Sequence, residues 1–252
     1  MKNIVLFDLD GTLSPARKAV DLDIILSPLK KLQKVAEIGI VTGSGNEYVI
    51  EQAASLLEEL ENIHVLPCNG TQYYKTGGEI IHSVDMQNEM GEFEFHVLMQ
   101  MILKLQNEIA SKYPISLTGH FVNFRGSMIN WCPIGRNANS EQRGRFKRFD
   151  EQLRIRSVYL TILKEQLATL SKEIVAVLGG NTSFDIYPSG WDKTYALKHF
   201  EGKKVYFVGD KCSGDGNDRT ICEEVGGNCF PVSGPEDTAR LIGEILIPLL
   251  KG

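Results

Sequence analysis

Short apolar runs alternate with amphipathic stretches at both ends of the chain. The runs are continuous rather than alternating, which is typical of strands buried on both faces of a parallel sheet. They lie at Ile4–Phe7, Ile38–Val41, Ile63–Leu66, Lys204–Val208 and Asn228–Pro231. Apolar residues at helical spacing predict helices near Leu22–Val35, Asn46–Leu60, Asp192–Phe200, Asp218–Val225 and Pro235–Leu250. This rhythm predicts an α/β, Rossmann-like parallel sheet with helices on both of its faces.

The middle of the chain has a different pattern. Hairpin-like segments lie at 71–83, with a turn at Gly77–Gly78, and at Phe121–Trp131, and two more strands follow near Ile174–Leu178 and Thr182–Tyr187. Helical runs are predicted at about Gln87–Lys112 and 140–170, the second broken near Ile155. Antiparallel strands and helices between two halves of a parallel sheet predict an inserted α+β cap domain. We expect the core to comprise residues 1–83 and 188–252, and the cap domain residues 84–187.

Composition narrows the class of protein. With 252 residues, 42% hydrophobic and 23% charged, the chain has ordinary globular composition, and its net charge of −5 argues against a general nucleic-acid binder. The five cysteines form no CxxC motif, which favours a reducing compartment over a disulfide framework. The histidines are dispersed, so no zinc site is expected. Neither a signal peptide nor a membrane span is predicted, so we expect a cytoplasmic protein without membrane partners.

The first predicted strand ends in two carboxylates, Asp8 and Asp10, followed by Gly11 and Thr12. Carboxylates at positions i and i+2 of an extended chain project to the same side, where their repulsion calls for a cation or a proton. Mg²⁺ suits such hard oxygen ligands and commonly shares its coordination with a phosphate. One carboxylate can then attack phosphorus while the other moves a proton. An acidic turn with a glycine at positive φ is the alternative, and we favour the chemical interpretation.

Three later segments are positioned to join this pair. In VTGSG, Ser44 and the start of the following helix can bind phosphate. A Gly/Ser turn alone is equally compatible with a plain connection between a strand and a helix. Lys193 in GWDK can neutralise a phosphoryl group, or be an ordinary surface charge. VYFVGDKCSGDGND repeats the strand–Gly–carboxylate arrangement, so Asp210 is expected to reach the same Mg²⁺ as Asp8, supported by Asp218.

A basic segment lies within the predicted cap domain. Between Arg125 and Arg156 there are eight Arg or Lys residues and three Asp or Glu residues. Several of these charges are compatible with a solvated helix face, whereas an arginine fork also binds phosphate oxygens in pairs. The segment therefore leaves open both a phosphate clamp and a plain polar surface.

The motifs together resemble a known family. DLDGTLSPARK resembles the first motif of the haloacid dehalogenase-like superfamily, and VTGSG and GWDK resemble its second and third. The pattern FRxxMIxxxPIGRxxxxEqR and the segment GGNTSFDIYPSGWDK resemble cap signatures of eukaryotic-type phosphomannomutases. The usual acidic residue after the second-motif serine is Gly45 here, and the segment 221–227 does not keep the family's secondary cation loop.

The resemblance implies a role for each motif residue. Asp8 is implied to be the nucleophile that becomes an aspartyl-phosphate, Asp10 the general acid/base, and Ser44 and Lys193 the groups that steady the phosphoryl group. It implies that Mg²⁺ is held by Asp8, the Asp10 backbone carbonyl and Asp210, with Asp218 in support. The implied substrate-binding residues, which grip the non-reacting phosphate and the sugar, are Arg17, Arg125, Arg136, Arg143, Ser183 and Asp185.

The resemblance also implies a reaction and its setting. A haloacid dehalogenase-like core with a cap would interconvert mannose 1-phosphate and mannose 6-phosphate in GDP-mannose biosynthesis, with hexose 1,6-bisphosphate as intermediate and activator. The family leads us to expect a homodimer formed through the cap. The preference for mannose over glucose phosphates stays open. Two alternatives stay open as well: a sugar-phosphate phosphatase with the same core, and a non-catalytic binder of phosphate or nucleic acid.

Overall fold

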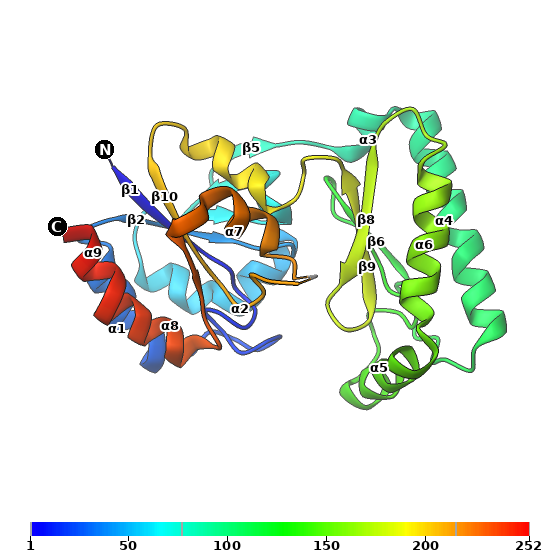
Figure 1. Cartoon of the computed structure of the whole chain (residues 1–252), viewed down its shortest axis with the longest axis horizontal. Coiled ribbons are helices and arrows are strands. Elements are labelled where there is room, and N and C mark those ends of the chain that lie inside the picture. The colour runs from blue at the N-terminus through cyan, green and yellow to red at the C-terminus, as the bar shows by residue number, and fades with distance from the viewer. Residues whose placement is uncertain (1, 77, 215, 252) are drawn as a thin grey trace. The chain divides into compact units, whose positions relative to one another are not determined.

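The computed structural model describes residues 2–76, 78–214 and 216–251. The chain divides into two compact units, Met1–Ser83 with Gly190–Gly252, and Val84–Ser189, each built around a sheet of its own (Figure 1). The chain therefore leaves the first unit once and returns to it after the second.

A seven-stranded sheet forms the centre of the first unit, in the order β11-β10-β1-β2-β3-β4-β5. The strands β11, β10, β1, β2 and β3 run parallel, and β4 and β5 add an antiparallel edge. Their bounds are β1 Asn3–Phe7, β2 Glu37–Val41, β3 His64–Leu66, β4 Gln72–Lys75, β5 Ile80–Ser83, β10 Lys204–Gly209 and β11 Cys229–Pro231. The predicted strands are confirmed to within a residue or two. In the predicted turn after β4, Gly78 has a φ of +84°, and Gly77 lies outside the described residues.

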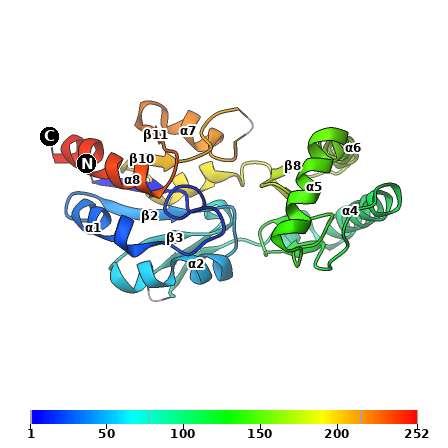
Figure 2. The same ribbon diagram turned by 90° about the horizontal axis from the view of Figure 1, so that it is seen from below.

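Alternate side chains of β1 pack into two separate hydrophobic cores, one on each face of the sheet. Val5 and Phe7 pack with the helices α1 (Leu22–Leu32), α2 (Asn46–Glu59) and α8 (Pro235–Leu241). Ile4 and Leu6 pack with η2 (Lys193–Phe200) and α7 (Arg219–Val225) on the other face. Figure 2 shows α2 and α7 on opposite sides of the sheet. The continuous apolar run of β1 is thus explained by burial on both faces. The short elements η1 (Cys68–Gly70), η3 (Gly226–Asn228), η4 (Ile242–Leu246) and α9 (Ile247–Lys251) complete the unit.

The second unit has a four-stranded antiparallel sheet, in the order β6-β7-β9-β8. The strands are β6 Val122–Phe124, β7 Ile129–Trp131, β8 Ile174–Gly179 and β9 Ser183–Pro188, and the helices are α3 Met86–Met90, α4 Glu92–Lys112, α5 Ser140–Leu153 and α6 Ile155–Leu167. Helix α6 packs on β8 and runs beside α4, as Figure 1 shows. The predicted α+β character of the middle of the chain is confirmed.

Helix interruptions account for most differences from the predicted elements. The run predicted at Gln87–Lys112 is split, because Gly91 has a φ of +81° and ends α3 before α4 begins. The predicted break near Ile155 is confirmed, since Arg154 has a left-handed backbone between α5 and α6. The segment after Asp192 is a 3₁₀ helix, and the C-terminal helix contains a π turn at η4.

One cysteine pair departs from the sequence-based expectation. Cys222 on α7 and Cys229 on β11 form a disulfide, whereas the spacing of the cysteines predicted none. The two residues are neighbours because α7 turns directly back into β11, a contact that a motif search for CxxC does not detect. No helix in the described part of the chain is both long and apolar enough to cross a membrane.

Candidate active site

Three loops of the first unit meet at one edge of its sheet. Asp8 follows the last residue of β1, residues 42–45 follow β2, and Asp210 follows β10. The three strands are parallel neighbours, so the loops at their carboxyl ends lie side by side. This topology brings together residues that are about two hundred positions apart in the sequence.

A cluster of carboxylates lies at this edge. Oxygen atoms of Asp8, Asp210 and Asp218 are all within 4.8 Å of one another. Asp8 and Asp218 are only 3% and 0% exposed. The glycines Gly11 and Gly209 allow this proximity, because a side chain at either position would collide with the carboxylate of Asp210 or Asp218. The predicted metal-site carboxylates are thus gathered, whereas the Asp10 side chain is not part of the cluster.

Lys193 is the cation of the cluster. It is 1% exposed, and its Nζ donates to Asp8 Oδ1 at 2.5 Å and to Asp218 Oδ1. Burial by itself lowers the pKa of Lys193, but the Asp218 and Asp8 charges outweigh it and raise that pKa above its usual value. Lys193 therefore stays protonated. It stands at the first position of η2, where the Asp192 side chain caps the following turn through Thr194 N (2.8 Å).

The charges of the cluster do not balance. Burial, together with the Asp218 and Asp210 charges, raises the pKa of Asp8 to about 7 against the opposing charge of Lys193. With all three carboxylates ionised, the ammonium of Lys193 and that of the half-exposed Lys211, whose Nζ lies 3.5 Å from Asp210 Oδ2, leave one negative charge over. Asp210 Oδ1 is buried and has no hydrogen-bond partner among the described residues. An unpaired buried oxygen in a set of hard oxygen donors with this charge fits a divalent cation.

Asp10 is held on both sides, outside the cluster. The Tyr48 hydroxyl donates to Asp10 Oδ1 and Oδ2, each at 3.0 Å, and the backbone N–H of Arg17 donates to Oδ1 at 2.6 Å. Arg17 has a left-handed backbone, with a φ of +60°, and its side chain is exposed. Tyr48 was missed by the sequence analysis. Its only signal was its position four residues, or about one helical turn, after Ser44.

Ser44 lies in the loop that leads into α2. Its backbone N–H donates to Thr42 Oγ1 at 3.2 Å, and its carbonyl accepts from Cys68 N at 2.8 Å. Helix α2 begins two residues later, and Gly45, which precedes it, has no side chain to cap the first turn. Backbone N–H groups at such a helix start suit an anion, so this loop can hold a phosphoryl group at the edge where the carboxylates lie.

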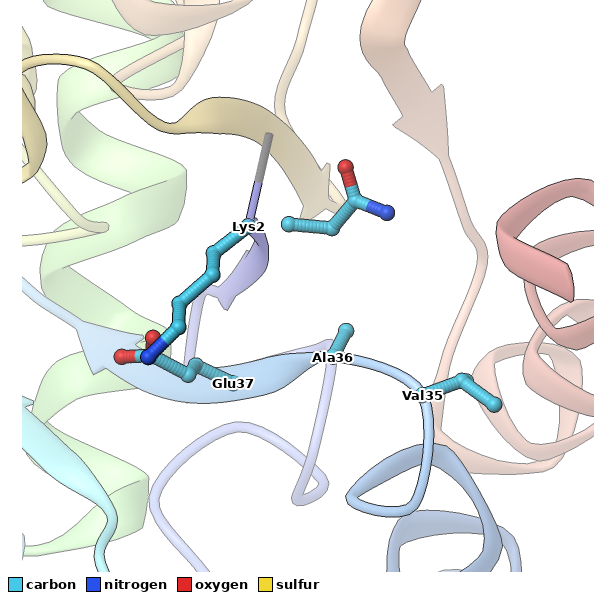
Figure 3. A pocket seen from close by; sticks show the side chains of 5 residues that line it. Lys2, Val35, Ala36 and Glu37 are labelled. Atoms are coloured by element: carbon cyan, nitrogen blue, oxygen red, sulfur yellow. The ribbon is translucent and has the colours of Figure 1, made fainter.

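A hollow of about 270 Å³ lies at the opposite edge of the sheet (Figure 3). It is lined by Lys2 and Asn3 at the start of β1 and by Val35, Ala36 and Glu37 at the start of β2. These are the amino ends of the strands, whereas the carboxylate cluster lies at their carboxyl ends. The length of the strands therefore separates the hollow from the cluster. It has no part in the site.

In the second unit, Asn130 joins three of the predicted substrate-binding residues. Asn130 is 3% exposed on β7, and its Nδ2 donates to Ser183 Oγ at 3.0 Å and to Asp185 Oδ1 at 2.7 Å. Its Oδ1 accepts from Arg136 Nη1 at 2.7 Å. In the sequence, Asn130 is recognisable only as one member of the hairpin-like segment Phe121–Trp131. Its polar side chain between Ile129 and Trp131 was the available signal.

Arg143 and Arg125 have different surroundings. The Arg143 guanidinium donates to the carbonyls of Ala138 (2.8 Å) and Arg136 (2.6 Å) and to Thr182 Oγ1 (3.0 Å), so it fixes the loop that carries Arg136. Arg125 lies half-buried in the turn between β6 and β7, with Nη1 4.0 Å from the Met128 sulfur. The structure therefore gathers Arg136, Arg143 and the β9 residues, with Arg125 on a separate turn.

Known proteins resemble the chain over nearly its full length. A family model described as eukaryotic phosphomannomutase matches residues 25–248. The phosphomannomutase of Saccharomyces cerevisiae is 36% identical over 248 residues, covering 97% of this chain and 94% of that protein. A Plasmodium falciparum IMP-nucleotidase structure matches with a TM-score of 0.64 at 17% identity, covering 96% of this chain and 69% of that one. A haloacid dehalogenase-like hydrolase from Bacteroides thetaiotaomicron matches with a TM-score of 0.59 at 14% identity, covering 97% and 100%. The two structures show the fold alone, and with it they confirm the predicted fold class.

Proposed function

Because the chain belongs to the eukaryotic phosphomannomutase family, we propose that it interconverts mannose 1-phosphate and mannose 6-phosphate by passing a phosphoryl group through Asp8. The protein is an enzyme of the phosphotransferase–isomerase type. The observation that best supports the route through Asp8 is its burial against Lys193 and beside two further carboxylates, at the edge of the sheet where loops carry the chemistry.

Four residues of the first unit have a role in the proposed reaction: Asp8, Asp10, Ser44 and Lys193. The Asp8 carboxylate attacks phosphorus, and the bond from phosphorus to the sugar oxygen breaks as an aspartyl-phosphate forms. Asp10 gives its proton to the departing sugar oxygen, and takes a proton from the attacking hydroxyl when the phosphoryl group returns to the sugar. Ser44, the N-terminal amides of α2 and the Lys193 ammonium hold the phosphoryl oxygens. A bisphosphorylated sugar that turns over between two such transfers leaves as the isomer.

We propose Mg²⁺ as the cation of this site. Asp8, the Asp10 backbone carbonyl and Asp210 would hold it. Asp218, whose oxygens accept from Lys193 and from the Lys211 N–H at 3.1 Å, would fix the lysine and the loop around it. When bound, Mg²⁺ supplies positive charge to the transferring phosphoryl group and orients it for attack.

Cation binding is expected to stabilise the protein measurably. Because Mg²⁺ would bind the folded chain and relieve the excess negative charge of the cluster, saturation at about a hundred times the dissociation constant adds about 2.7 kcal/mol to the free energy of unfolding. The melting temperature should rise on addition of MgCl₂ and fall back with EDTA. Asp210→Asn should remove most of this shift, and Asp23→Asn, an exposed carboxylate on α1, should leave it intact. An equal shift in the wild type and in Asp210→Asn would place the cation elsewhere.

We propose that the second unit binds the non-reacting phosphate and the sugar hydroxyls. The candidates are Arg125, Arg136, Arg143, Ser183 and Asp185, together with Arg17 of the first unit. The excess of basic residues between positions 125 and 156 supports a phosphate ligand. The network centred on Asn130 supports a preorganised set, because it fixes Arg136 relative to the two residues of β9.

Arg136→Ala is expected to separate mutase from phosphatase behaviour. Losing a charge-assisted contact to the distal phosphate costs about 1.5–3 kcal/mol of binding, so isomerisation should slow by ten-fold or more at subsaturating substrate. The aspartyl-phosphate should still form, because Asp8 and its neighbours are untouched. When the sugar is held less firmly, water competes better with the sugar hydroxyl for the phosphoryl group on Asp8. The ratio of free phosphate to isomerised sugar should therefore rise.

Arg145→Ala is the matched control for this experiment. Arg145 is an exposed arginine of the same α5 helix as Arg143, and it donates to Ser116 Oγ at 2.8 Å. It should leave both rates unchanged. A coupled assay with mannose 1-phosphate and glucose 1-phosphate, with and without hexose 1,6-bisphosphate, measures flux, substrate preference and activation together. If the wild type releases phosphate from the bisphosphate but never yields hexose 6-phosphate, the protein is a phosphatase instead.

We also propose a homodimer formed through the second unit. Two apolar side chains of α4 support this, since Phe93 and Leu103 are 78% and 55% exposed. Sedimentation of the wild type and of Phe93→Glu would test it, with a monomeric variant as the expected result. A cytoplasmic location is proposed from family membership alone.

A further inference from the structure

The Tyr48 hydroxyl and the Asp10 carboxylate form a contact that no motif assigns. Tyr48 is the third residue of α2, and its hydroxyl lies 3.0 Å from each carboxylate oxygen of Asp10. The backbone N–H of Arg17 reaches Oδ1 from the loop that follows β1. A carboxylate that is contacted from a helix and from a loop has little freedom to rotate about its Cβ–Cγ bond.

The phenol acts as the donor in this contact. An ordinary phenol is protonated at neutral pH, and a carboxylate has only acceptor oxygens, so the O–H of Tyr48 donates to Asp10. Tyr48 therefore keeps its proton. Helix α2, which also presents its first turn beside Ser44, thus fixes the position of the phenol relative to the phosphoryl-binding loop.

We propose that Tyr48 is a positioning residue for proton transfer by Asp10. Its hydroxyl holds the carboxyl group so that the proton reaches the sugar oxygen as the bond from phosphorus to that oxygen breaks and the bond from phosphorus to Asp8 forms. In the return step the same orientation lets Asp10 accept the proton of the attacking hydroxyl. The proposal rests on the proposed function in one respect, namely that the reacting oxygen belongs to a sugar phosphate.

The choice of phosphoryl donor isolates this role. A sugar oxygen is a poor leaving group that requires the proton, whereas acetate leaves from acetyl phosphate without one. Both donors, however, use the same attack by Asp8. A residue that acts through Asp10 therefore influences the first reaction and not the second. A residue that only supports the structure of the site influences both.

The experiment measures aspartyl-phosphate formation by rapid acid quench with labelled hexose 1,6-bisphosphate and with labelled acetyl phosphate. Tyr48→Phe should slow formation from the bisphosphate about ten-fold or more and leave formation from acetyl phosphate within about two-fold of wild type, since oriented proton transfer contributes only with the sugar donor. The acetyl phosphate rate also shows that the variant has folded with an intact Asp8 site.

Tyr159→Phe provides the matched control in the second unit. Its hydroxyl also donates to a carboxylate, Glu108 Oε1 at 2.8 Å, so the same kind of hydrogen bond is removed away from the proposed chemistry. It should leave both rates unchanged. Three results for Tyr48→Phe would overturn the proposal: an equal fall with both donors, no fall with either, or a faster reaction with the bisphosphate, which would mean that the phenol restrains Asp10.

A separate measurement, the yield of isomerised hexose phosphate from the wild type, tests the proposed function. If the wild type forms aspartyl-phosphate from the bisphosphate but yields no isomerised hexose phosphate, the mutase assignment fails. The comparison of donors still decides the role of Tyr48 in that case, because both the mutase and the phosphatase need a proton on the departing sugar oxygen.

Discussion

Asp8→Asn is expected to lower turnover by several orders of magnitude, which corresponds to an increase of more than ~4 kcal/mol in activation free energy. Asparagine keeps the size of the side chain and an oxygen that can accept from Lys193, but it removes the carboxylate that attacks phosphorus. The aspartyl-phosphate should disappear from acid-quenched samples. Steady-state kinetics and labelling with hexose 1,6-bisphosphate measure the two effects.

Substrate affinity should change far less than turnover in this variant. The distal phosphate is proposed to bind through arginines that Asp8 does not touch, so the dissociation constant of hexose 1-phosphate should stay within about an order of magnitude of wild type. Asp23→Asn controls for the chemistry of the substitution at an exposed position. An Asp8→Asn protein with even a tenth of the wild-type rate would remove Asp8 from the mechanism.

Lys193→Met is expected to have the largest effect on stability. The side chain is buried and bonds to Asp8 and Asp218, so methionine would leave two carboxylates close together without their cation. Removing one partner of a buried ion pair costs about 3–5 kcal/mol of the free energy of unfolding. Turnover should be lost as well, because the ammonium is proposed to hold the phosphoryl oxygens.

The loss of stability should depend on pH in a defined direction. In the wild type without metal the pKa of Asp8 is already raised to about 7, above its unfolded value, and loss of Lys193 raises it further. A folded state that prefers the protonated carboxyl is most stable at low pH and loses stability as the pH rises through the folded pKa. Urea denaturation in the presence of EDTA should therefore show that Lys193→Met lowers the free energy of unfolding, relative to the wild type, by more at pH 8 than at pH 5.

Lys198→Met is the control on the same helix. Lys198 is exposed and contacts the face of the Tyr195 ring, with Nζ 4.2 Å from its centroid, so its loss should cost less than about 1 kcal/mol at either pH. A deficit for Lys193→Met that is the same at both pH values would show that lost packing, not unpaired charge, sets the stability of the site.

The fold was largely readable from the sequence because burial on both faces leaves a simple signal. The apolar runs that became β1 and β2 contain no charged residue, the run of β10 has only Lys204 at its start, and Asp8 and Asp210 mark where β1 and β10 end. The break at Gly91 was not predicted, since the apolar spacing continues across it and only the backbone of that residue changes. The π turn of η4 likewise leaves no mark in the pattern of apolar residues.

The candidate site could be predicted from the sequence only where its residues belong to motifs. Asp8 and Asp210 follow the ends of neighbouring parallel strands, so the topology brings them together, and Lys193 stands at the start of η2. Tyr48 and Asn130 belong to no such arrangement. Each is a single polar residue on a regular element, and its partner lies 38 positions away for Tyr48 and 53 or more for the two β9 residues bound by Asn130. Such pairings follow from side-chain geometry, which the sequence pattern does not contain.

The separation of 185 positions between Asp8 and Lys193 has a consequence for biosynthesis. Strand β1 lies between β2 and β10, and β10 is translated only after the whole second unit. At roughly 5–20 residues per second, the nascent chain carries an unpaired edge of β1 and an Asp8 without its cation for on the order of ten seconds. The second unit contains only its own contiguous segment and can fold during that interval. The reactive centre is thus assembled late in translation, when the growing chain finally supplies residues 193–218.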